Sequence, residues 1–359
     1  MLLLNPGPVT LTERVRRAML QPDLCHREPE FFDLQDEART RLLAVYGLPA
    51  DTWQAVLITG SGTAAVESMV ASLVPEDGRL LVIENGVYGE RIAQIAAHYR
   101  IDHEAVRCDW LQAPDPAAIV ARLDAAAAAG RPFTHAALIH HETTTGRLNP
   151  VAPLAAACRE RGIHLLLDGV SSFGAEAIDF AEEALAAVAA AGNKCLHGVP
   201  GLSFVMVRRG ALARAARRAF YLDLGRLAEL QDRRNTPFTP AVHACYALVE
   251  ALRELDEAGG WRRRHEHYAA LAERARSGLA ALGIESMLPA AESSVVLRAY
   301  RLPARLAYDA LHDGLKAAGF VIYAGQGGFS GRMFRISTMG DLHAPDIDRL
   351  LQAAAGLVD

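Results

Sequence analysis

The sequence predicts an α/β fold in which helices cover both faces of a mainly parallel sheet. From residue 55 to residue 207, short apolar runs alternate with amphipathic or alanine-rich segments, a pattern typical of such sheets. After about residue 240 the pattern changes to long helices with a few short strands, which predicts a smaller α+β domain. We therefore expect an N-terminal segment over 1–15, a large domain over 16–258 and a small C-terminal domain over 259–359.

The apolar runs give the expected strands of the large domain. They are Ala55–Thr59, Arg79–Glu84, Ala136–His140, His164–Asp168 and Ser203–Val207. The alanine-rich run Glu182–Ala191 predicts a helix by propensity alone, although a strand over its second half would bring the following loop to the sheet edge.

In the C-terminal part the periodicity predicts helices over 240–257 and 261–282, one near 305–318 and one at the end of the chain. Strands are expected at Ser294–Ala299, Phe320–Tyr323 and Met333–Ser337. The pair Gly259-Gly260 marks the expected junction between the domains.

The bulk composition excludes several classes of function. The chain has 359 residues, a net charge of −5 and a pI near 6.2, which argues against a nucleic-acid partner. No apolar run reaches membrane-spanning length, so we expect no membrane partner and a cytoplasmic location. The 5 cysteines show no C-x-x-C spacing, and no histidine cluster suggests a metal site.

Lys194 and Asp168 are the most informative residues. Asp168 ends the apolar run that begins at Ile163, and Lys194 follows on a loop of small residues. An acid at the end of a buried strand and a lysine on a nearby loop suit pyridoxal 5'-phosphate (PLP). The lysine amine can form a Schiff base with this cofactor, and the carboxylate can keep the pyridine nitrogen protonated.

A glycine-rich loop fits the phosphate of the same cofactor. Gly60–Thr63 follows the first expected strand and precedes the helical pattern Ala64–Leu73. Free backbone N–H groups at that helix start, together with the hydroxyls of Ser61 and Thr63, would form a phosphate cradle.

The same loop also allows a different class of enzyme. Gly60, Gly62 and Ala65 match the dinucleotide fingerprint, and Glu84 sits where a ribose-binding acid belongs. An NAD-dependent oxidoreductase is therefore an alternative. Against it, the loop lies well inside the chain, and that function would leave the acid and the lysine without a role.

Over essentially its full length the chain resembles the class V aminotransferases of PLP fold type I, and most closely those that act on 2-aminoethylphosphonate and pyruvate. The blocks that carry the resemblance are Asn5–Pro8, Gly60–Glu67, Asn85–Arg91, His141–Gly146, Asp168–Gly174, Asn193–Gly201, Phe238–Thr239, Gly319–Tyr323 and Phe334–Ile336. The resemblance implies a seven-stranded, mainly parallel sheet between helices, with a smaller C-terminal domain.

It also implies the roles of individual residues. Lys194 would be the Schiff-base lysine and Asp168 the partner of the pyridine nitrogen. The cofactor would further be bound by Ser61, Gly62 and Thr63 at its phosphate, by Tyr88 and Val170 on the two ring faces, by Thr143 near its hydroxyl and by Asn193. Thr239 would reach the phosphate in a neighbouring subunit, which implies a homodimer with shared active sites, and Arg335 would bind the substrate anion.

The implied reaction moves the amino group of 2-aminoethylphosphonate to pyruvate. Two differences keep an alanine– or serine–glyoxylate aminotransferase open as an alternative. Ala324-Gly325-Gln326 stands where the phosphonate enzymes have Pro-Gly-Lys, and Cys25–Phe31 looks like the general family sequence. The amino donor and the acceptor are therefore open from the sequence.

Overall fold

A seven-stranded sheet forms the centre of the computed structural model, which describes residues 1–358. Its strands are β2 (Trp53–Thr59), β3 (Arg79–Glu84), β4 (Asp102–Arg107), β5 (His135–Ile139), β8 (His164–Asp168), β9 (Leu185–Ala191) and β10 (Leu202–Arg208). They lie in the order β2-β10-β9-β8-β5-β3-β4. Only β10 runs antiparallel to its neighbours, so the predicted mainly parallel sheet is confirmed.

Helices cover both faces of this sheet. One face packs against α2 (Pro29–Ala44), α5 (Pro116–Ala128), α6 (Val151–Glu160) and α8 (Val242–Glu257). The other packs against α3 (Gly62–Leu73), α4 (Val87–His98) and α7 (Leu224–Asp232). Leu165 and Leu167 of β8 point to the first layer and Leu166 to the second, because successive strand residues alternate between faces.

The run Glu182–Ala191 is not the helix that propensity alone predicts, because Leu185–Ala191 forms the inner strand β9 and all seven of its residues are buried. The strand expected over the second half of the run is confirmed. It pairs with β8 on one side and β10 on the other. Burial between two strands and two helix layers overrides the helix propensity of alanine.

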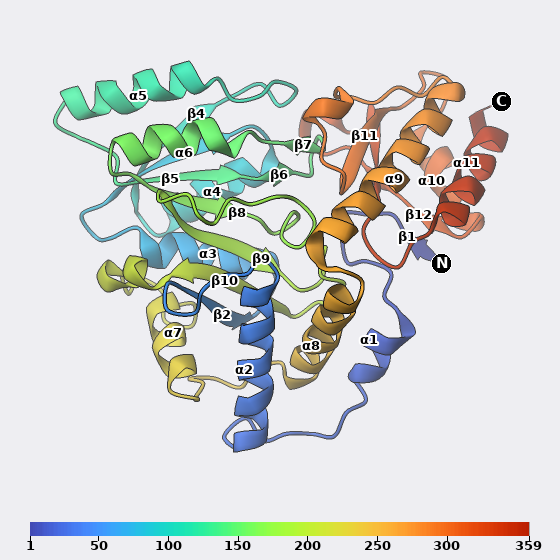
Figure 1. Cartoon of the computed structure of the whole chain (residues 1–359). Coiled ribbons are helices and arrows are strands. Elements are labelled where there is room, and N and C mark those ends of the chain that lie inside the picture. Colours follow the sequence, from blue (N-terminus) through green and yellow to red (C-terminus); the bar gives the residue numbers. More distant parts are fainter. Residues whose placement is uncertain (359) are drawn as a thin grey trace.

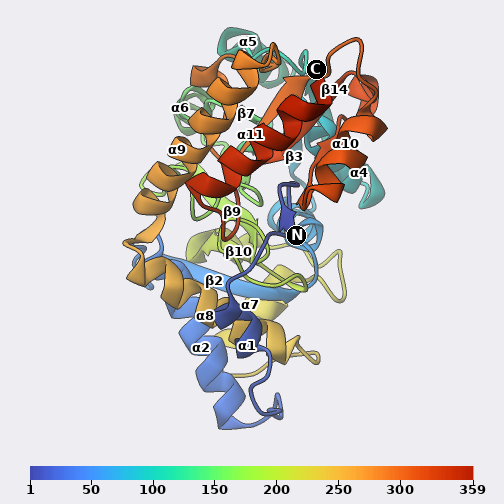
Figure 2. The ribbon, with the colours of Figure 1, turned by 90° about the vertical axis from the view of Figure 1, so that its right-hand side faces the viewer.

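The C-terminal elements form their own hydrophobic core. They are α9 (Gly260–Ala281), β11 (Leu297–Arg301), α10 (Tyr308–Ala317), β12 (Phe320–Val321), β13 (Tyr323–Ala324), β14 (Met333–Ser337) and α11 (Ala344–Val358). Figure 1 shows them gathered on one side of the molecule in orange and red, and Figure 2 shows α9 running from the region of α8 into this group. The domain boundary at residue 259 stays a prediction.

The N-terminal segment joins this C-terminal group. Strand β1 (Leu2–Leu3) pairs in parallel with β12, and Leu4 is buried in the C-terminal core. The chain then passes Pro6 and continues into α1 (Glu13–Ala18), which lies against α8. The first residues therefore lead from the C-terminal group toward the sheet edge (Figure 1).

The short elements complete the description. They are β6 (His141–Glu142), β7 (Arg147–Leu148) and the 3₁₀ turns η1 (Arg209–Arg214), η2 (Ala290–Glu292) and η3 (Gly327–Phe329). Within residues 1–358, no helix combines the length and the apolar character needed to cross a membrane.

Candidate active site

A narrow cleft lies where the carboxyl ends of β5 and β8 meet the start of α3. The residues that line it are Gly62, Thr63, Val66, Tyr88, Arg91, Ile139, His141, Thr143, Asp168, Val170, Ser171 and Lys194. In open α/β sheets this edge is the usual place for a ligand, because the strand ends and the helix N-termini both face it.

The sheet topology brings Asp168 and Lys194 together. Strands β8 and β9 are parallel neighbours, with Asp168 opposite Ala189. The chain leaves β9 at Ala191 and turns at once, so Lys194 returns to the edge at which Asp168 ends its strand. Two residues 26 positions apart in the sequence thus line one cleft, as the sequence predicts.

Lys194 is a partly buried amine that shares the cleft with Asp168 and Arg91. Its ammonium group donates a hydrogen bond to the backbone carbonyl of Pro6, from the N-terminal segment. Burial, helped by the positive charges of Arg335 and Arg91 and opposed by the carboxylate of Asp168, lowers the pKa of Lys194 to about 8. At pH 7 about one tenth of this amine is therefore neutral, a far larger share than for a solvent-exposed lysine.

Asp168 is a buried carboxylate with one strong internal partner. Its Oδ1 accepts a hydrogen bond of 2.9 Å from the backbone N–H of Val170. Burial raises the pKa of Asp168 to about 6. A cation beside the second carboxylate oxygen would offset this desolvation cost, and a protonated pyridine nitrogen is such a cation.

The start of α3 offers unpaired backbone donors. The backbone N–H groups of Gly62 and Thr63 have no acceptor within residues 1–358, whereas Ala64 N–H donates to Ser61 O at 2.9 Å. The N-cap Ser61 makes no side-chain capping hydrogen bond. A Cβ at Gly62 would come within 2.5 Å of Val170 Cγ1, so this position has to be glycine for α3 to approach the cleft wall. Such an end suits a phosphate group.

Arg91 is a residue that the sequence reasoning missed, although it ends the block Asn85–Arg91. It lies in the cleft with its guanidinium carbon 4.7 Å from the centre of the Tyr88 ring. Its Nη1 donates to the Thr63 hydroxyl at 3.3 Å. The cleft therefore holds a positive charge beside the expected phosphate cradle.

Arg335 lies beside the cleft and is 1% exposed. It donates hydrogen bonds to three neutral acceptors: Nε to Ala324 O (3.0 Å), and Nη1 to Thr143 O (2.9 Å) and to Gln326 Oε1 (3.1 Å). Thr143 lines the cleft, so this contact links Arg335 to it. Burial lowers the pKa of Arg335, as expected for a cation without a paired anion.

His141 is a second residue that the sequence reasoning did not single out. Its Nδ1 lies 3.2 Å from Ser171 O, so this nitrogen carries the proton, and burial lowers the pKa of His141 to about 4. Its Nε2 is buried in the cleft wall and has no hydrogen-bond partner among residues 1–358. The ring is therefore neutral, with an acceptor left unused.

Besides Arg335, three predicted residues do not line this cleft. Ser61 lies next to it as the N-cap of α3, and Asn193 precedes Lys194 in the turn after β9. Thr239 lines a separate small cavity with Tyr221 and Phe238. Within one chain Thr239 is thus not brought to the lysine, and its contact with the phosphate in a neighbouring subunit stays a prediction.

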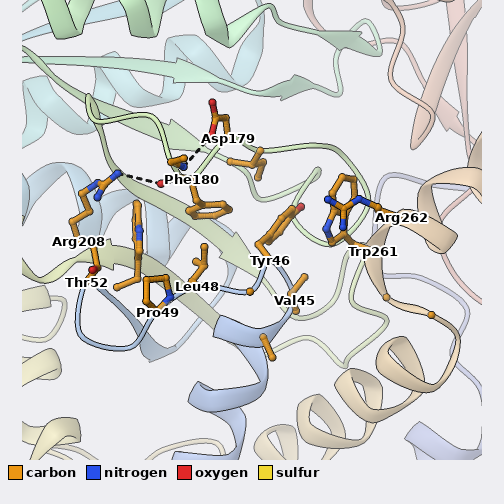
Figure 3. A pocket seen from close by; sticks show the side chains of 17 residues that line it. Val45, Tyr46, Leu48, Pro49, Thr52, Asp179, Phe180, Arg208, Trp261 and Arg262 are labelled. Atoms are coloured by element: carbon orange, nitrogen blue, oxygen red, sulfur yellow. Dashed lines mark hydrogen bonds between the residues drawn. The ribbon is translucent and has the colours of Figure 1, made fainter.

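A larger and more open hollow lies elsewhere, between the end of α2 and the start of α9 (Figure 3). Arg262 lines it without a hydrogen bond or ion pair within residues 1–358, but other polar side chains of the hollow are bonded within the chain. Arg208 donates to the carbonyl of Phe180 at 3.1 Å, and the Tyr46 hydroxyl donates to Glu176 O at 2.7 Å. This hollow therefore has few polar groups free to bind a ligand. The narrow cleft, by contrast, has an unpaired acceptor at His141 Nε2 among the described residues 1–358.

The side chains of the cleft fit PLP. A buried acid can pair with the ring nitrogen, a partly neutral lysine can bind the aldehyde, and a helix start can bind the phosphate. Val170 and Tyr88 provide apolar walls for a ring.

Comparison with known proteins agrees with a PLP site in this cleft. The family model for class V aminotransferases matches residues 20–299. A 2-aminoethylphosphonate–pyruvate transaminase from Aeromonas hydrophila is 38% identical over 99% of this chain and 94% of its own length. One from Vibrio vulnificus is 35% identical over 98% of this chain and 96% of its own.

Solved structures show the same fold. The alanine–glyoxylate aminotransferase of Nostoc sp. superimposes with a TM-score of 0.91 at 25% identity, over 100% of this chain and 95% of that one. An aspartate aminotransferase from Thermus thermophilus gives 0.90 at 26% identity, over 100% of this chain and 99% of that one. The fold is thus that of the fold type I, PLP-dependent aminotransferases.

The chain belongs to the class V aminotransferases. It is an enzyme that uses PLP and acts on small molecules. The oxidoreductase alternative is wrong, because the class V aminotransferase model matches residues 20–299, which include the glycine-rich loop Gly60–Thr63. Glu84 is paired with Arg107 at 3.1 Å in the structure.

Proposed function

We propose that this protein is a 2-aminoethylphosphonate–pyruvate transaminase, which converts 2-aminoethylphosphonate and pyruvate into phosphonoacetaldehyde and L-alanine. The observation that carries the proposal is the buried guanidinium of Arg335, which has only neutral acceptors around it. It needs an anion, and both substrates are anions. The full-length similarity to transaminases of this name supports the same donor and acceptor.

In the proposed reaction, Lys194, Asp168 and Arg335 each have a separate role. PLP, when bound, supplies an aldehyde for the amino group and a ring that accepts electrons. Lys194 would bind the aldehyde and, when its amine is free, would take and return a proton, which a pKa of about 8 allows. Asp168 holds the proton on the ring nitrogen, and Arg335 binds the phosphonate or the carboxylate.

The remaining predicted residues hold the cofactor. We assign the phosphate to Ser61, Gly62 and Thr63 at the start of α3, where backbone N–H groups are unpaired. Tyr88 and Val170 would enclose the ring, and Thr143 and Asn193 would contact its edge. The Arg91 guanidinium, which bonds Thr63, adds positive charge beside the phosphate.

An alanine– or serine–glyoxylate aminotransferase is the competing function. The similarity in fold to the Nostoc alanine–glyoxylate enzyme favours it, as does a neutral Gln326 where the sequence comparison leads one to expect a lysine. A donor panel separates the two functions. Purified protein with PLP is mixed with one amine at a time, and the change in the visible absorption of the cofactor is recorded.

We expect 2-aminoethylphosphonate to change the spectrum, and pyruvate to restore it with formation of alanine. If alanine or serine changes the spectrum with glyoxylate as the acceptor, while 2-aminoethylphosphonate leaves it unchanged, the competing function replaces the proposal.

We also propose a homodimer with shared active sites, in which Thr239 reaches the phosphate bound by the partner. The support is an aromatic cluster next to Thr239. Phe220 is 76% exposed, and Tyr221 stacks on Phe238 with ring centres 4.6 Å apart. Exposed aromatic groups of this kind favour burial in an interface. We further propose a cytoplasmic enzyme, which suits the five free cysteines.

A further inference from the structure

We propose that Gln326 is a substrate-binding residue that makes the site favour anions with three oxygens over carboxylates. The inference rests on the proposed function, because it assigns the anion to Arg335. It starts from the hydrogen bond between Arg335 Nη1 and Gln326 Oε1 at 3.1 Å.

Only some of the five N–H groups of Arg335 donate hydrogen bonds within residues 1–358. Three have protein acceptors: Nε–H bonds Ala324 O, and the two hydrogens of Nη1 bond Thr143 O and Gln326 Oε1. The two hydrogens of Nη2 have no acceptor within residues 1–358. An anion that approaches this edge therefore finds Nη2 open and Nη1 already bonded to the Gln326 amide.

The backbone of Gln326 is fixed. A Cβ at the preceding Gly325 would lie 2.3 Å from Phe329 O, so the turn requires glycine there. The carbonyl of Gln326 accepts from Phe329 N at 3.1 Å, and the Phe329 ring lies 6.0 Å from Trp110. The side chain of Gln326 is therefore the part that can move.

The amide of Gln326 can serve in two orientations. Its oxygen must face Arg335 in the structure, because Nη1 is a donor. An anion on Nη1 and Nη2 would bring its own oxygen beside Oε1, and two acceptors repel. A rotation of the terminal amide removes this conflict and turns the NH₂ group toward the anion. Gln326 thus changes from an acceptor for Arg335 into a donor for the substrate.

This extra donor distinguishes the two kinds of anion. A carboxylate has two oxygens, which Nη2 and the Nη1 hydrogen released by Gln326 can satisfy. A phosphonate has a third oxygen, which needs a donor other than the two guanidinium N–H groups. The Gln326 amide, half-buried beside that edge, supplies one.

The test uses the PLP-loaded enzyme and three donors that differ in their anionic group: 2-aminoethylphosphonate, 2-aminoethylsulfonate and 3-aminopropionate. Gln326→Leu removes the amide at similar size. We expect it to lower the ratio of kcat/KM for the phosphonate to that for the carboxylate by about tenfold. The sulfonate, with three oxygens and less charge, should fall with the phosphonate. Equal losses for all three donors would show a role only in folding and overturn the proposal.

Binding of methylphosphonate and acetate, measured by calorimetry, provides a readout without turnover. We expect Gln326→Leu to weaken methylphosphonate binding about tenfold more than acetate binding. Gln326→Glu should weaken both, because its carboxylate would pair with Arg335. Wild-type affinity for methylphosphonate in either variant would overturn the proposal. If wild type binds methylphosphonate through Gln326 but does not convert 2-aminoethylphosphonate, the proposed function fails and the role of Gln326 stands.

Discussion

Lys194 is one of only two lysines in a chain whose other 35 basic residues are arginines, and the second, Lys316, is exposed on α10. An arginine keeps its proton at any accessible pH, whereas a buried lysine can lose it. The one position where the chain places a lysine in a cleft is therefore the one where a removable proton is useful.

The burial of Lys194 predicts a pH-dependent cost in stability. Its pKa falls from 10.5 to about 8 on folding, so between these values the unfolded chain binds more protons than the folded one. The free energy of unfolding of the cofactor-free protein should thus rise with pH through this window, and the full cost is present below pH 8.

Lys194→Met should remove that cost. In cofactor-free protein at pH 7 we expect the variant to gain on the order of 1 to 3 kcal/mol, less about 1 kcal/mol for the lost bond to Pro6 O. The difference between variant and wild type should shrink from pH 8 to 10.5, as measured by urea unfolding. A difference independent of pH would contradict the lowered pKa.

Single residues could be predicted where a motif and a strand end coincide. Asp168 and Lys194 were found in this way, and the structure places both in one cleft. The contacts of Arg91, His141 and Gln326 could not be predicted, because they depend on how loops from distant segments fold together. Arg91 and His141 lie in the blocks Asn85–Arg91 and His141–Gly146, which carry the family resemblance. Membership of these blocks is the only sequence signal that marks the two residues as candidates for the site.

At the scale of elements, two alanine-rich runs show what a sequence can predict. Pro116–Ala128 is a helix on the outside of the sheet, as propensity predicts, whereas Leu185–Ala191 is a buried strand. In β9 the small side chains allow α3 to approach, since Gly62 lies close to Ala191 as well as Val170. Tertiary packing therefore determines that Leu185–Ala191 forms a strand, and the local sequence does not indicate this.

The strand β4 illustrates the opposite failure. Its sequence Asp102–Arg107 has only two apolar residues, Ala105 and Val106, and is only half-buried at the sheet edge, so it has no continuous apolar run. The buried strands β2, β3, β5, β8 and β10 were found by such runs within two residues at each end. Periodicity therefore predicts the centre of the sheet better than its edge.

At the scale of the whole molecule, the proposed dimer predicts that activity depends on the aromatic cluster beside Thr239. Phe220→Asp would place a charge in the proposed interface, so we expect the protein to shift toward monomer and to lose most of its activity. Sedimentation velocity and activity measured at the same concentration test this. A wild-type monomer with full activity would refute the shared site.

The whole account depends on which amine of the chain carries the cofactor. Borohydride reduction of the PLP-loaded protein, followed by peptide mass spectrometry, locates the cofactor directly, because the chain offers only Lys194, Lys316 and the N-terminus. We predict that the label is found on Lys194, that Lys316→Arg keeps both label and activity, and that Lys194→Ala loses both. A label on Lys316 or the N-terminus, or full transaminase activity in Lys194→Ala, would contradict the account.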